Sequence, residues 1–116
     1  MISDNELIKH ITDCCSDEKA DDIVVLDVRN LTSLTEYFII TSGRNPKHVQ
    51  SISDNVNNKL SLLEIFPLRR EGYQEGTWII SDYNSAILHI FCAEKRNHYD
   101  LERLWGEAPK IAIIPN

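Results

Sequence analysis

The sequence predicts a single α/β domain in which helices flank a mixed sheet of about five strands. Five short apolar runs alternate with segments whose apolar residues recur every three or four positions, and such segments stand before, between and after the runs. A chain of 116 residues is long enough to bury one hydrophobic core, and a second domain is not expected. Residues 1–116 are therefore treated as one domain.

Two helices have clear start signals. The capping-box pattern that begins at Ser3 predicts a first helix from about Asp4 to Cys15. Asn45 suits the N-cap of a second helix and Pro46 its first position. The apolar residues of this helix then recur at three- and four-residue intervals as far as Leu63.

Apolar and β-branched runs predict the strands. The last two predicted strands are separated by Asp82–Ser85, which has the composition of a hairpin turn. Side chains alternate along a strand, so Trp78 is either a core residue or stands on the outer face of this hairpin. The five predicted strands are Ile23–Val28, Tyr37–Thr41, Leu68–Tyr73, Thr77–Ser81 and Ala86–Cys92.

The stretch from Gly76 to Gly106 carries the best candidates for contacts with a partner. Protein interfaces are enriched in Trp, Tyr and Arg, which bury large areas and keep a polar group. Tyr83, in a predicted turn, is expected to be the most exposed candidate. A third helix is predicted from about Asn97, and Trp105 is expected to face the core from it. The candidates are Trp78, Tyr83, Arg96, Tyr99 and Trp105.

Composition limits the classes of partner. The formal net charge of −6 disfavours sequence-independent binding of nucleic acid and suits docking on a basic protein. No apolar run approaches the roughly 20 residues of a membrane span, and the first residues do not resemble a secretory signal. We therefore expect a cytoplasmic protein. Three cysteines, with Cys14 and Cys15 adjacent, indicate reduced thiols.

The sequence gives little support for catalysis, and neither a metal nor a cofactor is expected. The four histidines and three cysteines lack metal-ligand spacing, and no strand carries paired carboxylates for phosphoryl transfer. The one candidate for phosphate binding is the Ser42–Gly43 turn before the second helix, because a helix N-terminus offers free amides. A nucleotide-binding or nucleotidyltransferase-type enzyme using this turn is the alternative hypothesis, and a plain oligomerisation module is a third.

Short motifs from about Asp21 to Trp105 occur in a characteristic order. The first half contains Asp22-Ile23-Val-Val-Leu26-Asp27-Val28, Tyr37-Phe38-Ile39-Ile40 and Ser42-Gly43. The second half contains Glu75-Gly-x-Trp78, Ser81-Asp82-Tyr83, His89-Ile90-Phe91 and Arg96-x-x-Tyr99-Asp-Leu101-Glu102-x-Leu104-Trp105. This order resembles the signature of the ribosomal silencing factor family, also called the Iojap or RsfS family.

The resemblance implies a fold related to nucleotidyltransferases, without their activity. It further implies binding to the large ribosomal subunit through ribosomal protein L-fourteen, which sterically blocks joining of the small subunit and lowers translation when nutrients are scarce. Homodimers of the free protein are also implied. The matching positions expected to contact the ribosomal protein are Trp78, Asp82, Tyr83, Arg96 and Tyr99.

The chain departs from the family pattern at a few positions. Asn84-Ser85 replaces the usual Gly-Asp, which removes a charge beside the expected contact. Asparagine tolerates a positive φ, so the turn itself is expected to survive. Glu36 stands where an aspartate is usual, and Lys47-His48 replaces a common Arg-Gln pair.

Overall fold

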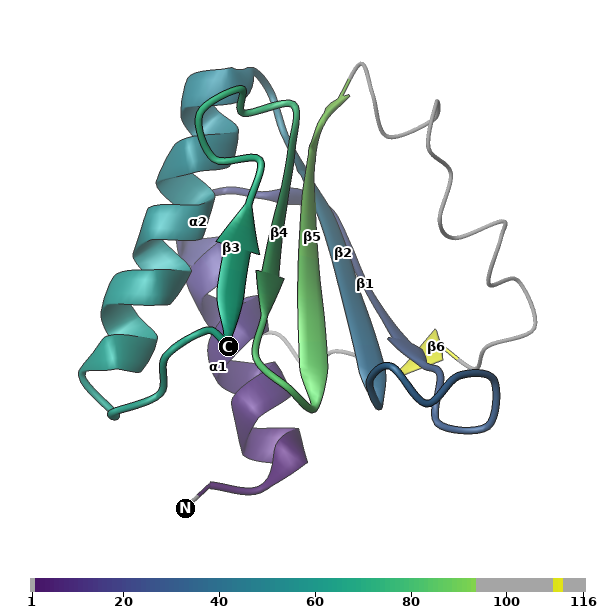
Figure 1. The fold of residues 1–116 in the computed structure, drawn as a ribbon. Helices are drawn as coiled ribbons and strands as arrows, with labels where there is room; N and C mark the ends of the chain where they lie inside the picture. Colours follow the sequence, from purple (N-terminus) through teal and green to yellow (C-terminus); the bar gives the residue numbers. More distant parts are fainter. Residues whose placement is uncertain (1, 94–109, 112–116) are drawn as a thin grey trace.

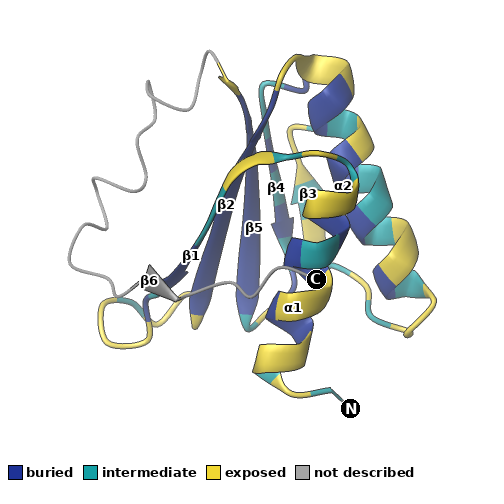
Figure 2. Ribbon diagram, turned by 180° about the vertical axis from the view of Figure 1, so that it is seen from behind, coloured by how far each residue is buried: buried dark blue, intermediate teal, exposed yellow. Residues whose placement is uncertain are grey.

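The computed structural model describes residues 2–93 and 110–111, which form two helices and one sheet (Figure 1). Both helices lie against the same face of the sheet (Figures 1 and 2). No helix in these ranges is long and apolar enough to cross a membrane. The elements are α1 (Asp4–Asp17), β1 (Asp21–Asp27), β2 (Tyr37–Gly43), α2 (Pro46–Ser61), β3 (Arg69–Glu71), β4 (Trp78–Asp82), β5 (Ala86–Cys92) and β6 (Lys110–Ile111).

The sheet is mixed and has the strand order β3-β4-β5-β2-β1-β6. Among the described strands, β2 and β5 alone pair in parallel, from Tyr37↔Ala86 to Gly43↔Cys92, and the other neighbouring pairs are antiparallel. All residues of these two central strands are buried, as expected for strands covered on both faces. The predicted fold class and all five predicted strands are confirmed, and β6 adds a sixth at the edge beside β1.

The first two predicted helices form for the predicted reasons. The Ser3 hydroxyl accepts a hydrogen bond from the Glu6 backbone N–H at 3.2 Å, and the Glu6 carboxylate accepts one from the Ser3 backbone N–H. Asn45 Oδ1 accepts the backbone N–H of His48 at 2.9 Å. Pro46 occupies the first turn of α2.

The end of α2 differs from the prediction. The helix stops at Ser61, and Leu63, which the apolar repeat placed on the buried face, is exposed. The Leu60 carbonyl accepts the N–H groups of Leu63 and Ile65, and Glu64 between them has a φ of +60°. This left-handed residue turns the chain away before another helical turn can form.

The two faces of the sheet have separate cores. On one face, α1 and α2 pack against inward residues such as Ile39, Ile79 and Leu88. On the other face, Leu26 and Phe91 belong to a second buried cluster built from sheet residues. The predicted third helix lies outside the described residues.

The predicted turn at Ser42–Gly43 is wrong. Both residues belong to β2 and are buried, because pairing with Phe91 and Cys92 of β5 extends the strand beyond Thr41. A Cβ atom on Gly43 would lie 2.8 Å from Val49 Cγ2 and 2.9 Å from the Val49 amide nitrogen. Glycine at this position therefore permits close packing of α2 on the sheet, and Val49 fills the space beside it.

We predict that Gly43→Ala destabilises the protein by about 1–3 kcal/mol, because the added methyl group overpacks a helix–strand contact. The change is measured as the free energy of unfolding in urea. Combining it with Val49→Ala should cost less than the sum of the two single changes, since the smaller side chain removes the contact with Cγ2 and leaves only the contact with the Val49 backbone. Additive costs would contradict this explanation.

Candidate partner-binding site at the β4–β5 hairpin

The β4–β5 hairpin forms as predicted. Its turn is closed by the Tyr83 amide, which donates to the Ala86 carbonyl at 2.9 Å. Asn84 has a φ of +74°, and its backbone N–H donates a hydrogen bond to Asp82 Oδ1 at 2.8 Å. The asparagine thus supplies the left-handed residue that the turn requires, and Asp82 stabilises it with its side chain.

The predicted exposure of Tyr83 is wrong, because only 6% of the residue is exposed. Positions 79, 81 and 83 are buried while 78, 80 and 82 are half-buried, so Tyr83 continues the inward alternation of β4 into the turn. Its hydroxyl has no hydrogen-bond partner within residues 2–93 and 110–111, and burial raises the pKa of Tyr83 to about 12. The phenol ring therefore holds the turn on the core beneath the helices.

Trp78 lies on the face of the hairpin opposite the helices and is half-buried. Its ring stacks on Phe91, with centroids 5.0 Å apart, and its indole N–H donates to His89 Nδ1 at 3.1 Å. Of the two positions that the sequence allowed, the structure selects the outer face. The indole is held in one orientation by both contacts, which suits a preorganised contact with a partner.

His89 is a buried, neutral base at the centre of this aromatic cluster. The bond from Trp78 makes Nδ1 an acceptor and places the ring proton on Nε2, which is buried and has no hydrogen-bond partner among the described residues. Phe38 packs edge-on against the imidazole at 5.1 Å. Burial lowers the pKa of His89 to about 4, since a charged ring would lose its hydration.

We predict that the protein loses up to about 3 kcal/mol of stability as the pH falls from 6.5 toward 4. The unfolded state, with an ordinary histidine pKa, takes up a proton before folded His89 does, so acid favours unfolding. His89→Phe should flatten this part of the profile, measured by urea unfolding at each pH. His10→Gln changes an exposed histidine and should leave the slope intact. An unchanged slope in His89→Phe would show that another group is responsible.

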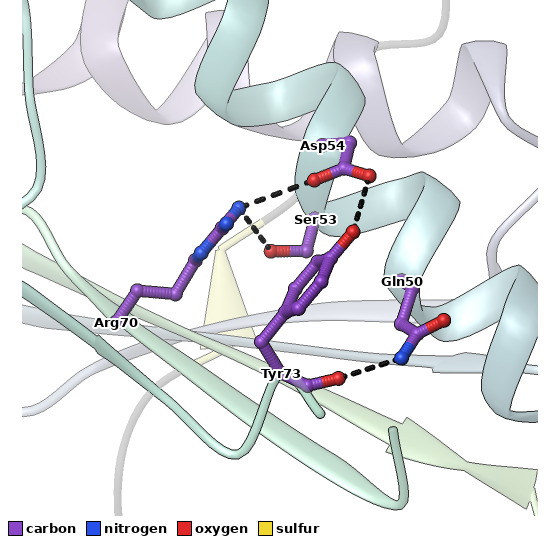
Figure 3. Close-up of polar contacts among 5 residues, drawn as sticks. All are labelled: Gln50, Ser53, Asp54, Arg70 and Tyr73. Atoms are coloured by element: carbon purple, nitrogen blue, oxygen red, sulfur yellow. Dashed lines mark hydrogen bonds and ion pairs between the residues drawn. The ribbon is translucent and has the colours of Figure 1, made fainter. Parts of the chain in front are cut away.

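A polar cluster fastens the outer edge of the hairpin to α2 (Figure 3). The Tyr73 hydroxyl donates to Asp54 Oδ2 at 2.7 Å, and Arg70 Nη1 lies 3.3 Å from Asp54 Oδ1. The Arg70 guanidinium also stacks over the Tyr73 ring at 4.4 Å, and Gln50 donates to the Tyr73 carbonyl at 2.7 Å. β3 and the β3–β4 connection are therefore tied to the helix.

Sequence reasoning missed this cluster. The available signal was the spacing of Gln50 and Asp54, which stand at i and i+4 beside the apolar stripe of α2. Their partners Arg70 and Tyr73 lie 16 to 23 residues further along the chain. Nothing local in the sequence joins the two groups.

We predict that Tyr73→Phe costs about 0.5–1.5 kcal/mol of stability, because the hydroxyl bond to Asp54 is lost. Gln74→Ala, a change at the exposed neighbouring position, serves as the control. Thermal unfolding of both variants measures the difference. Equal midpoints for Tyr73→Phe and the wild type would mean that this bond does not hold the edge in place.

Of the remaining expected contacts, Asp82 lies within the described residues. Asp82 is half-buried and lies 3.9 Å from Arg69 of β3 in addition to its role in the turn. Arg96, Tyr99 and Trp105 lie outside the described residues.

The other departures from the family pattern are accommodated locally. Glu36 is exposed in the β1–β2 connection. His48 is buried, and its Nδ1 accepts a hydrogen bond from the Arg44 backbone N–H at 2.9 Å. The Nε2 atom of the same ring lies 2.6 Å from the Glu18 carbonyl oxygen. The histidine thus links the start of α2 to the end of α1.

The described part of the chain offers no cluster of metal ligands. Within it, no three His, Cys, Asp or Glu residues are grouped so that they could hold a metal ion. The three cysteines are free thiols, as predicted, and all are buried. Burial raises the pKa of the Cys14 thiol above its usual value, which disfavours the reactive thiolate.

Comparisons with known proteins match almost the whole chain. Residues 2–115 match the family described as "RsfS: Ribosomal silencing factor during starvation". A Bacillus subtilis protein named ribosomal silencing factor RsfS is 31% identical over 108 residues, covering 93% of this chain and 92% of the relative. A chloroplastic Iojap protein of Zea mays is 29% identical over 84% of this chain and 42% of its own length. A crystal structure of a Chromobacterium violaceum protein superposes with a TM-score of 0.88 at 28% identity, covering 99% of this chain and 95% of the other.

Proposed function

The chain belongs to the ribosomal silencing factor family, and we propose that it represses translation by binding the large ribosomal subunit and blocking its union with the small subunit. The observation that carries this proposal is the family match over residues 2–115. The proposed contact on the ribosome is protein L-fourteen, and the proposed setting is the cytoplasm under nutrient limitation. Repression by steric block needs binding alone, with no chemical step.

Charge and site geometry support a docking role. A protein with a net charge of −6 is attracted to basic ribosomal proteins, and such attraction speeds encounter and orients the partners. The hairpin presents Trp78 on a rigid aromatic stack, with Asp82 at its end. We propose these two residues as contacts, together with Arg96 and Tyr99, while Tyr83 supports the turn from inside.

The proposed factor is not an enzyme and uses no cofactor. The alternative of nucleotide binding relied on an open turn at Ser42–Gly43, and these residues are instead buried in β2. Val49 of α2 packs against Gly43 so closely that a Cβ atom there would lie 2.8 Å from Val49 Cγ2, which does not favour an open phosphate-binding turn at this position. The family resemblance further suggests a homodimer for the free protein.

Co-sedimentation with purified large ribosomal subunits tests the proposed function. The protein should travel with large subunits through a density gradient and should not travel with small subunits. Weakening by salt is also expected, because opposite charges contribute to the contact. A protein that never travels with large subunits would overturn the proposal.

We predict that Trp78→Ala weakens binding to large subunits by about 1–3 kcal/mol, as loss of an aromatic contact at an interface does. A sedimentation titration measures the dissociation constant. The matched control is Tyr83→Phe, which removes only a buried hydroxyl that bonds to nothing in the described part of the chain and should bind like the wild type. If folded Trp78→Ala binds normally, or if this change unfolds the domain, the assignment of Trp78 as a contact is wrong.

A further inference from the structure

We propose that the β1–β2 loop, residues 28–36, forms a second contact of the docking surface, with Leu34 as its apolar anchor and a basic protein surface as its partner. This inference rests on the proposed function and adds a contact that the family motifs did not indicate. Four observations support it: the exposure of the loop leucines, the fixed loop backbone, its continuity with the hairpin turn, and its charge.

The loop presents two large apolar side chains to solvent. Leu34 is 76% exposed and Leu31 is 42% exposed. Burial of an exposed leucine side chain is favourable, so a partner that covers Leu34 gains binding free energy.

Hydrogen bonds fix the backbone of the β1–β2 loop in a conformation that leaves Leu34 exposed. The Val28 carbonyl accepts the amides of Leu31 and Thr32 at 3.0 and 3.1 Å, and the Val28 amide donates to the Glu36 carbonyl at 3.0 Å. The Leu34 amide donates to Thr32 Oγ1 at 3.2 Å. Because these bonds are already formed, a partner would lose little free energy in ordering the loop.

The β1–β2 loop and the β4–β5 turn lie at the same end of the sheet (Figure 1). Thr35 Oγ1 donates to the Asn84 carbonyl at 3.0 Å, and the Ser85 carbonyl accepts the amides of Glu36 and Tyr37 at 3.2 and 3.1 Å. Between the two segments lies a shallow groove of about 380 Å³, lined by Leu34 and Asn84 among others. A partner that docks on the end of the hairpin therefore reaches the loop as well.

Charge favours a basic partner at this groove. Glu36 lines the groove, and the neighbouring Asp4 carboxyl raises the pKa of Glu36. Arg29 also lines the groove and offsets part of this negative charge, but its Nη2 lies 2.6 Å from Asp27 Oδ2, so the three carboxylates of Asp4, Asp27 and Glu36 outnumber it. A lysine or arginine of the partner would relieve the repulsion between Asp4 and Glu36 while an apolar group covers Leu34.

A second exposed apolar patch provides a matched control. It lies between α2 and β3, where Leu62 is 82% exposed and Phe66 and Leu68 are also exposed. Beside it, the Arg69 guanidinium lies 3.8 Å from the Glu71 carboxylate and 3.9 Å from the Asp82 carboxylate. This patch has the apolar surface of the β1–β2 loop without its carboxylate pair.

The test is a sedimentation titration of full-length variants against purified large ribosomal subunits. Leu34→Ser should raise the dissociation constant by roughly tenfold or more, while Leu62→Ser should stay within about twofold of the wild type. Glu36→Lys should also weaken binding and reduce its salt dependence, whereas Glu64→Lys, at an exposed position on the other patch, should not. All four positions are exposed, and equal unfolding midpoints would show that the fold is retained.

The outcomes separate this inference from the function on which it rests. If the wild type does not bind large subunits, the proposed function fails and the second contact fails with it. If the wild type binds and Trp78→Ala weakens it, while Leu34→Ser binds normally, the second contact alone is wrong. Weakening by Leu62→Ser in place of Leu34→Ser would assign docking to the other patch and overturn the inference.

Discussion

The parallel pairing of β2 with β5 determines where both proposed contact segments lie. Parallel neighbours begin at the same end of a sheet, so the segments that precede them must meet there. The β1–β2 loop leads into β2 and the β4–β5 turn leads into β5, and Ser85 of the turn bonds to Glu36 and Tyr37. The complete burial of both strands fixes this register, since a slip by one residue would turn every side chain to the opposite face.

The alternation of side chains along β4 gives the two faces of the hairpin different roles: one face packs on the core and the other carries the proposed contact residue. Ile79 and Tyr83 face the core under the helices, while Trp78 stands on the opposite face and stacks on Phe91. Asp54 of α2 bonds to Arg70 in β3 and to Tyr73 in the β3–β4 connection. These bonds keep the β3 edge of the sheet against α2. Trp78 and Asp82 are thus positioned by contacts within the protein before any partner arrives.

Local signals predicted most of the fold. The caps at Ser3 and Asn45 and the turn at Asn84 depend on residues within a few positions, and all three were predictable. Features set by distant pairing were not. Ser42 and Gly43 have the composition of a turn, yet pairing with β5 makes them a strand, and the alternation of β4 buries Tyr83 in a turn that composition alone would expose. The two-residue β6 and the polar cluster on α2 likewise depend on contacts that no local pattern records.

The proposed mechanism requires that one bound protein prevent two ribosomal subunits from joining. Light scattering from purified large and small subunits measures joining directly as the magnesium concentration is raised. Preincubating large subunits with the wild-type protein should suppress the rise in scattering in proportion to the fraction of large subunits occupied. A full rise with large subunits that sedimentation shows to be saturated would mean that the protein binds without blocking the subunit interface, and would contradict the proposed repression of translation.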